Sequence, residues 1–239
     1  MIDMFRKKPI LKYNSTLPEY PDAITPAKKH VPEWYKKIPR FRGGKIFSIK
    51  DGYNPTVKLC VPFLDSLTTG YMITLPYDIY VAIQENGHPW VTWPPGVLDV
   101  NQISKRPVVA DKNIVPFEHY DTEFTWNYCV SYTFPKGYSC ILTHPFNRHD
   151  LPFTTMTGII DGGIVMTAHG KVPFYIKKNF EGIIPQGTPI AQLVPFRQEN
   201  WKSKKIKNLE VEGLIHNGSA GHKFYGWYKN TFWVRKQYE

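Results

Sequence analysis

Residues 157–196, TGIIDGGIVMTAHGKVPFYIKKNFEGIIPQGTPIAQLVPF, carry the strongest structural pattern in the chain. Short apolar runs each end at glycine or proline, and the glycines recur at spacings that suit strands and turns and not helices. The last part, IPQGTPIAQLVPF, is a turn followed by a mostly apolar strand. We therefore expect a compact β unit here.

The preceding region has the same character. Residues 71–75, 79–83 and 90–93 are rich in strand-forming residues, and Asn86-Gly87 between the last two predicts a hairpin. Residues 124–132 alternate as one strand does, and a turn at 135–138 leads to a further strand at 139–143. These patterns predict an antiparallel β-sandwich.

The two ends of the chain differ from this body, so we divide it into an arm (1–58), a β-rich core domain (59–196) and a charged segment with an aromatic helix (197–239). Five prolines between Pro18 and Pro39 exclude long helices from the arm, although residues 32–37 suit a short one. We expect the arm to be extended and to dock outside the hydrophobic core. Residues 198–209 and 224–239 are expected to be helical. The predicted partner-binding anchors are Trp34, Tyr35, Phe41, Trp227 and Trp233.

Charge and composition restrict the classes of function. The 239 residues have a formal net charge of +10, which would attract nucleic acid or an acidic protein face. A solvated basic surface explains the same charge, and no nucleic-acid-binding motif accompanies it. No apolar run approaches the roughly 20 residues of a membrane helix, and we expect no membrane association and no signal peptide. Widely spaced Cys60, Cys129 and Cys140 are expected to be small buried hydrophobes.

Reactive side chains are concentrated in the proline-bounded segment 144–153. His144, His149 and Asp150 are candidates for a catalytic acid–base pair, but the same residue types also form turns and satisfy backbone groups. Asp161, at a strand end, would either orient a water or ribose hydroxyl or cap the Gly162-Gly163 turn. A metal site lacks further ligands at a suitable spacing, so we expect no metal. GxSxG, Walker A and GxGxxG motifs are missing, and no cofactor is predicted.

Two resemblances add to this interpretation. The strand GIID at 158–161 and the later IPQGTPIAQLV at 184–194 resemble late motifs of dUTPases and dCTP deaminases, which have the β-clip fold. The resemblance implies a mainly β fold class: an antiparallel β-sandwich or β-clip-like body, with an extended N-terminal arm and a short C-terminal helix. Gly163 stands where that family has a stacking aromatic residue, and the Pro-Arg-Ser phosphate motif is missing, which puts the family's chemistry in doubt.

The whole chain also resembles an uncharacterised family of T-even-like marine tailed phages and some bacteria. The similar pieces are PAKKHVPEWY at 26–35, CVPFLDSLTTGY at 60–71, PKGYS at 135–139, HPFNR at 144–148 and residues 182–201. This resemblance implies a viral setting and no particular reaction.

The sequence thus favours a non-enzymatic phage structural or accessory protein, made in the host cytoplasm and located in the virion, on a capsid or tail. Its expected partners are other viral structural proteins or further copies of itself, with nucleic acid as an additional candidate. The alternative is a β-clip-type nucleotide-binding or nucleotide-hydrolysing enzyme in which Asp161, Gln192 and residues 144–150 line the pocket.

Overall fold

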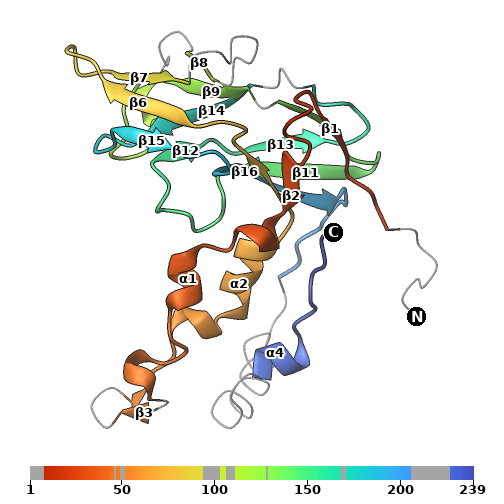
Figure 1. The fold of residues 1–239 in the computed structure, drawn as a ribbon. Coiled ribbons are helices and arrows are strands. Elements are labelled where there is room, and N and C mark those ends of the chain that lie inside the picture. The colour runs from red at the N-terminus through yellow and green to blue at the C-terminus, as the bar shows by residue number, and fades with distance from the viewer. Residues whose placement is uncertain are drawn as a thin grey trace. The chain divides into compact units, whose positions relative to one another are not determined.

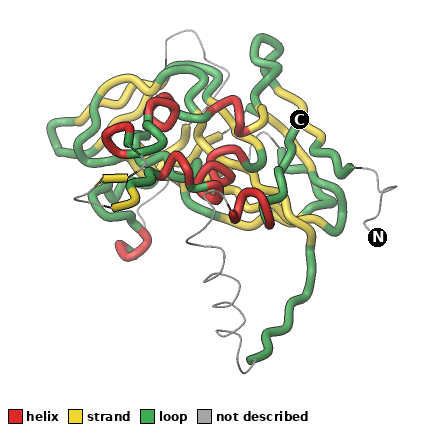
Figure 2. The backbone as a smooth tube through the Cα atoms, turned by 90° about the horizontal axis from the view of Figure 1, so that it is seen from below, coloured by secondary structure: helices red, strands yellow, loops and turns green. Residues whose placement is uncertain are grey.

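The computed structural model describes residues 8–45, 47–48, 52–93, 103–105, 111–127, 129–167, 171–205 and 227–239. The chain forms two compact units: unit 1 comprises residues 1–36, 66–198 and 238–239, and unit 2 comprises residues 37–65 and 199–237. The described elements are mainly antiparallel strands with a few short helices, which confirms the predicted fold class, including a short C-terminal helix (Figures 1 and 2).

Unit 1 contains nearly all the strands of the described ranges, arranged in four antiparallel sheets. The five-stranded sheet has the order β13-β11-β16-β5-β2, the four-stranded sheet β12-β14-β9-β8, the three-stranded sheet β15-β6-β7, and β1 pairs with β10. The bounds are β1 Lys12–Ser15, β2 Ile24–Pro26, β5 Tyr71–Thr74, β6 Ile79–Ile83, β7 Pro89–Thr92, β8 Ile103–Lys105, β9 Phe124–Asn127, β10 Val130–Thr133, β11 Tyr138–Thr143, β12 Phe153–Thr155, β13 Gly158–Asp161, β14 Lys171–Ile176, β15 Gly182–Ile184 and β16 Pro189–Arg197.

The helices in the described ranges are short. The α-helices are α1 Glu33–Lys37, α2 Val61–Thr68 and α4 Trp227–Thr231; the 3-10 helices are η1 Ala27–His30, η2 Arg42–Gly44, η3 Val57–Leu59 and η4 Lys112–Ile114. Unit 2 also holds the small hairpin β3 Phe47–Ser48 and β4 Gly52–Tyr53. None of the helices in the described ranges has the length and apolarity needed to cross a membrane.

The stretch 157–196 forms strands as predicted, but they belong to three sheets. β13 and β16 flank β11 in the five-stranded sheet, while β14 joins β9 and β15 joins β6. The glycines and prolines set where each strand ends, and long-range pairing sets its neighbours.

The core of unit 1 takes residues from all four sheets and is rich in aromatic rings. Trp126 stacks on Phe174 with ring centroids 3.6 Å apart, and Phe153 meets Trp126 edge-on at 4.9 Å. The indole N–H of Trp126 donates to Thr155 Oγ1 at 3.0 Å, so its one polar group is satisfied although the side chain is fully buried. Such aromatic pairs contribute roughly 1 kcal/mol each beyond the area they bury.

Three expectations about secondary structure are wrong. Residues 124–132 form two strands, β9 and β10, in different sheets, because strand alternation does not show where a strand changes partner; residue 128 lies outside the described residues. Residues 198–205 are not helical: the Gln198 N–H donates to Gly137 O at 3.0 Å, which continues the β11–β16 pairing, and residues 206–209 are outside the described ranges. The terminal helix α4 ends at Thr231 and not near the chain end.

The expectation that residues 1–58 lie outside the core is also wrong. β2 pairs with β5 in the five-stranded sheet, and Ala23 and Ile24 belong to the core cluster. β2 is an edge strand, and Pro26 ends it, so the missing proline N–H leaves no ladder bond unmade. Because of the prolines, the sequence did not predict β2, a strand that contributes to the core.

The cysteines differ from one another. Cys129 and Cys140 are buried as predicted, and burial raises their thiol pKa values to about 11 and about 12 respectively. Cys60 is exposed, which corrects the expectation of burial for that residue. All three are free thiols.

Candidate functional site

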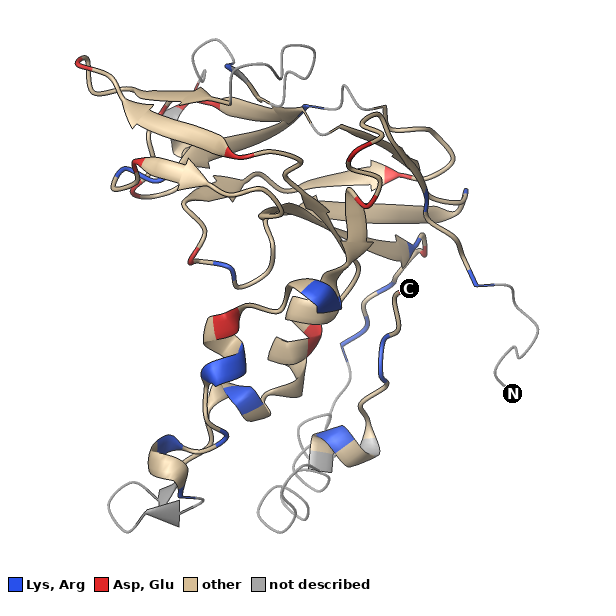
Figure 3. Ribbon diagram, in the orientation of Figure 1, with Lys and Arg blue, Asp and Glu red and all other residues tan. Residues whose placement is uncertain are grey.

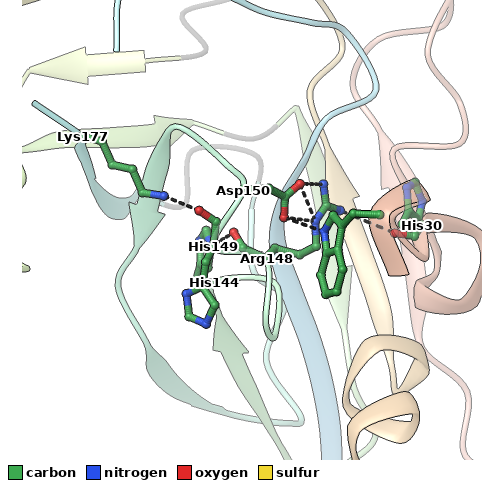
Figure 4. A network of polar contacts seen from close by, with 7 residues as sticks. His30, His144, Arg148, His149, Asp150 and Lys177 are labelled. Carbon is green, nitrogen blue, oxygen red and sulfur yellow. Dashed lines mark hydrogen bonds and ion pairs between the residues drawn. The ribbon is translucent and has the colours of Figure 1, made fainter. Parts of the chain in front are cut away.

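The predicted polar segment forms the loop between β11 and β12, and His144 fastens its two ends (Figure 4). The Thr155 N–H donates to His144 Nδ1 at 3.3 Å, so the ring proton lies on Nε2, which donates to Arg148 O at 3.1 Å. Burial lowers the pKa of His144 to about 4. The imidazole is therefore neutral near pH 7 with both nitrogens used by the backbone, which suits a structural role better than proton transfer.

We predict that His144 makes the protein less stable in weak acid. Its pKa is lowered on folding, so the unfolded chain binds the proton more readily. The stabilisation is complete above the unfolded pKa of about 6.5 and is lost as the pH falls towards the folded pKa of about 4. The loss should reach about 2 kcal/mol by pH 5.

Urea unfolding at a series of pH values will measure this loss in wild type, His144→Asn and, as the exposed control, His149→Asn. Only His144→Asn should lose this part of the pH dependence. The pKa of His30 is also lowered, mainly by burial and further by the charges of Arg148 and Lys29. His30 therefore contributes to the pH dependence in the same direction, but it does so in all three proteins. Parallel pH profiles for wild type and His144→Asn would contradict the assignment.

Asp150 is held in a two-pronged ion pair with Arg148. Arg148 Nε lies 2.9 Å from Oδ1 and Nη2 lies 2.9 Å from Oδ2, while the Trp34 indole N–H donates to Oδ1 at 3.2 Å. Burial raises the pKa of Asp150, but Arg148 and the Trp34 hydrogen bond outweigh it and lower the pKa overall. The carboxylate therefore stays ionised and serves to tie the loop to α1.

Gln192 on β16 anchors the same loop through its side-chain amide. It is fully buried; its Oε1 accepts from the Phe146 N–H at 2.8 Å, and its Nε2 donates to Ser66 O at 3.0 Å and Thr69 O at 2.7 Å. Asn147, in the left-handed region with φ of 58°, donates to Ser66 Oγ at 2.7 Å. Every polar group of the Gln192 amide is thus bonded within the protein. The sequence did not indicate this structural role; only the enzyme alternative uses Gln192, as a lining residue of a nucleotide pocket.

Asp161 lies far from the other catalytic candidates. It pairs with Ser139 at the start of β11, whereas His144 follows the end of that strand, so they are roughly 17 Å apart along it. Asp161 Oδ1 accepts from Ser139 Oγ at 2.7 Å and from Gln198 Nε2 at 3.2 Å. His149 is exposed, and its backbone oxygen accepts from Lys177 Nζ. The candidates therefore do not form one site, and no three metal-ligating side chains converge in the part of the chain that the structure describes.

The predicted partner-binding aromatics occupy different environments. Tyr35 is buried within its own chain, so the structure presents no surface of it to a partner. Trp34 and Phe41 are half-buried, and the half-buried Trp233 donates its indole N–H to Asp65. The Trp227 side chain lies outside the described residues. Apart from Tyr35, these assignments stay predictions.

An apolar surface that the sequence analysis did not single out lies on the three-stranded sheet. Here we call it the β6 face; it comprises Tyr80, Ala82, Trp90, Thr92 and Ile183. In the register, Tyr80 is opposite both Ile183 and Thr92, and Ala82 is opposite Trp90, so the five side chains share one face. Tyr80, Trp90 and Ile183 are 39%, 54% and 52% exposed. The alternate residues of these strands, Ile79, Val81, Val91 and Ile184, belong to the core cluster.

Comparisons with known proteins give little further information. No family model and no curated protein matches the chain. Among solved structures, a mutant dUTPase from phage phi11 of S. aureus matches with 19% identity and a TM-score of 0.24, covering 46% of this chain and 99% of that one. A mutant dUTPase of Staphylococcus bacteriophage 80alpha matches with 19% identity and a TM-score of 0.24, covering 46% and 91%. At these TM-scores the likeness carries no argument about fold or activity.

Proposed function

We propose that the protein is a non-enzymatic phage structural or accessory component that acts through protein–protein contacts, with the β6 face as a contact surface. The observation that supports this proposal is the contiguous exposure of Tyr80, Trp90 and Ile183 on one side of a three-stranded sheet. Contiguous apolar patches of this kind are typical of interaction sites, whereas single exposed apolar residues are common. The viral setting is supported by the sequence resemblance alone.

A second copy of this chain is the occupant that the chemistry of the β6 face favours. None of its five residues carries a charge, so the face complements itself without placing like charges together. Two copies related by a two-fold axis would bring the same residues against each other, which is the geometry of most homodimers. Tyr and Trp supply large apolar area with few rotatable bonds, so ordering them costs little entropy.

The bonding of the 144–150 loop also supports a non-enzymatic role. The polar groups of three residues are bonded within the protein: those of the neutral His144, the ion-paired Asp150 and the buried Gln192. Burial of a general base with both nitrogens bonded leaves no atom for a substrate.

A β-clip-type nucleotide-handling enzyme remains the alternative proposal, and one observation favours it. The two strands that carry the dUTPase-like motifs, β13 and β16, lie on either side of β11, and Asp161 is exposed at the end of β13. Thermal-shift measurements with each deoxynucleotide and magnesium test this alternative; no shift and no turnover would exclude it.

We predict that Trp90→Lys converts an oligomer to a monomer. Burying an unpaired ammonium group in the contact is costly, and the indole area is lost as well. Light scattering coupled to size-exclusion chromatography should show wild type as an oligomer whose mass falls on dilution, and the variant as a monomer that still melts cooperatively. Phe117→Lys, at a residue that is 90% exposed elsewhere in unit 1, is the matched control and should behave as wild type.

A monomeric wild-type protein at all concentrations would exclude self-association through the β6 face. The virion setting has its own test: washed phage particles should contain the protein at a fixed copy number by mass spectrometry, and its absence would reject that setting.

A further inference from the structure

The positive charge of this protein is concentrated in unit 2. Unit 2 contains fourteen of the 30 lysines and arginines but only five of the 20 aspartates and glutamates, a net charge of +9, whereas unit 1 has sixteen against fifteen, a net charge of +1. Figure 3 shows Lys and Arg along the described parts of unit 2. A charge gathered in one small unit indicates a specific polyanionic partner more strongly than the same charge spread over the whole surface.

Unit 2 also contains an open cleft of about 770 Å³. This volume is within the roughly 300–1,000 Å³ typical of ligand sites. Among the residues that the structure describes, its lining includes the cations Arg40, Lys58 and Lys229 and the aromatic residues Tyr228 and Trp233, and no acidic residue. Most of the remaining lining is apolar. The cleft therefore suits a ligand that combines a flat apolar group with negative charge.

Trp233 is held in place on the side of its indole nitrogen. The indole N–H donates to both carboxylate oxygens of Asp65, at 3.1 and 2.9 Å. Lys236 forms an ion pair with the same carboxylate at 2.5 Å, so the charge of Asp65 is compensated and does not oppose an anion nearby. A fixed aromatic wall loses little entropy when a ligand stacks on it.

We infer that the cleft of unit 2 binds single-stranded nucleic acid, with a base against Tyr228 or Trp233 and the neighbouring phosphates at Arg40, Lys58 and Lys229. Proteins that bind single strands combine a basic groove with aromatic rings on which bases stack, and a duplex does not offer the faces of its bases. A net charge of +9 across unit 2 also exceeds what one free nucleotide requires, and it suits several consecutive phosphates.

Fluorescence anisotropy with a labelled oligothymidylate of about twelve nucleotides tests this inference on the full chain. Wild type should bind it with an affinity that falls steeply with salt. Tyr228→Ala should weaken binding about 5- to 150-fold, as expected for one lost stacking contact. Lys58→Gln should lower the slope of log affinity against log salt by about 0.7, as expected for one lost phosphate contact. The controls are Phe232→Ala, at an exposed aromatic residue outside the cleft lining, and Lys171→Gln, at an exposed lysine of unit 1; both should bind as wild type.

Cys60 supplies a measurement that needs no substitution. It is the exposed cysteine and lines the cleft, whereas Cys129 and Cys140 are buried. The oligothymidylate should slow the reaction of Cys60 with a maleimide, as followed by mass spectrometry. Lack of binding, or binding without protection of Cys60, would overturn the inference. Equal binding of heparin or duplex DNA would show that charge alone acts. Equal protection of Cys60 by thymidine monophosphate would overturn the inference of a single strand and indicate a free nucleotide as the ligand. The β6 face plays no part in these measurements, so failure here leaves the proposed self-association intact.

Discussion

Replacing Gly70 with alanine should abolish stable folding of unit 1. Gly70 has a φ of +74°, and a Cβ atom built on it would lie 1.9 Å from Leu193 O and 3.0 Å from Leu193 C. These are backbone atoms of β16, the central strand of the five-stranded sheet, so no side-chain rotation relieves the clash. The sheet would have to separate where β5 begins. We expect the free energy of unfolding to fall by more than about 4 kcal/mol, which is the range of substitutions that disrupt a core.

Gly87→Ala is the matched control for this change. Gly87 has nearly the same φ, +77°, but a Cβ atom there would meet nothing within 4 Å. Its cost should be only the intrinsic preference against left-handed backbone, about 1–2 kcal/mol. Urea unfolding followed by tryptophan fluorescence will compare the two variants with wild type. Similar losses for both would mean that the φ angle, and not the approach to Leu193, makes Gly70 necessary.

Gln192→Leu should also destabilise the protein strongly, without any ligand present. The substitution replaces the amide with an apolar side chain of similar size and leaves three groups without their partner: the Phe146 N–H and the carbonyls of Ser66 and Thr69. Each buried polar group left unsatisfied costs about 1–3 kcal/mol, and solvent entry will relieve part of this. We expect a loss of about 3–5 kcal/mol in the free energy of unfolding, with the same urea assay as the measurement.

The control for Gln192→Leu is Gln198→Leu, at the residue that directly follows β16. Gln198 is exposed, and its amide bonds to Ser139 and Asp161 near the surface, so its loss should cost less than about 1 kcal/mol. An unchanged stability of Gln192→Leu, combined with lost nucleotide binding, would refute the structural role and support the enzyme alternative. The structural role thus predicts a loss of stability in Gln192→Leu, whereas the enzyme alternative predicts a loss of nucleotide binding at unchanged stability.

The polar loop shows why residue types predicted the wrong kind of site. His144, His149, Asp150 and Asp161 are the residue types that catalysis uses, and their order in the chain placed them close together. In the fold, Asp161 is at the opposite end of β11 from His144, and Asp150 is paired with Arg148 and contacted by Trp34, which is 116 residues away. Nothing in the local sequence indicates that an indole from the arm meets this carboxylate.

Local features of the chain were predictable because their causes are local. Asn86-Gly87 predicts the β6–β7 turn through the φ that glycine permits, Pro32 predicts the start of α1, and glycines and prolines bound the strands from 157 to 196. In the structure, alternate residues of β6 and β7 are buried and exposed, but apolar residues occupy both sides, so the sequence did not indicate which side faces solvent.

The partners of each strand, and the use of each polar group, depend on contacts between distant residues. Ile24 is in the core because β2 adds to β5, residues 124–132 divide between two sheets, and Gln192 is buried because the loop after β11 and the end of α2 cover it. These arrangements follow from burying apolar area while giving buried polar groups hydrogen-bond partners from distant parts of the chain. That condition applies to the whole chain. The pattern of a single segment constrains only its turns and its hydrophobic periodicity, so it does not reveal the partners of that segment.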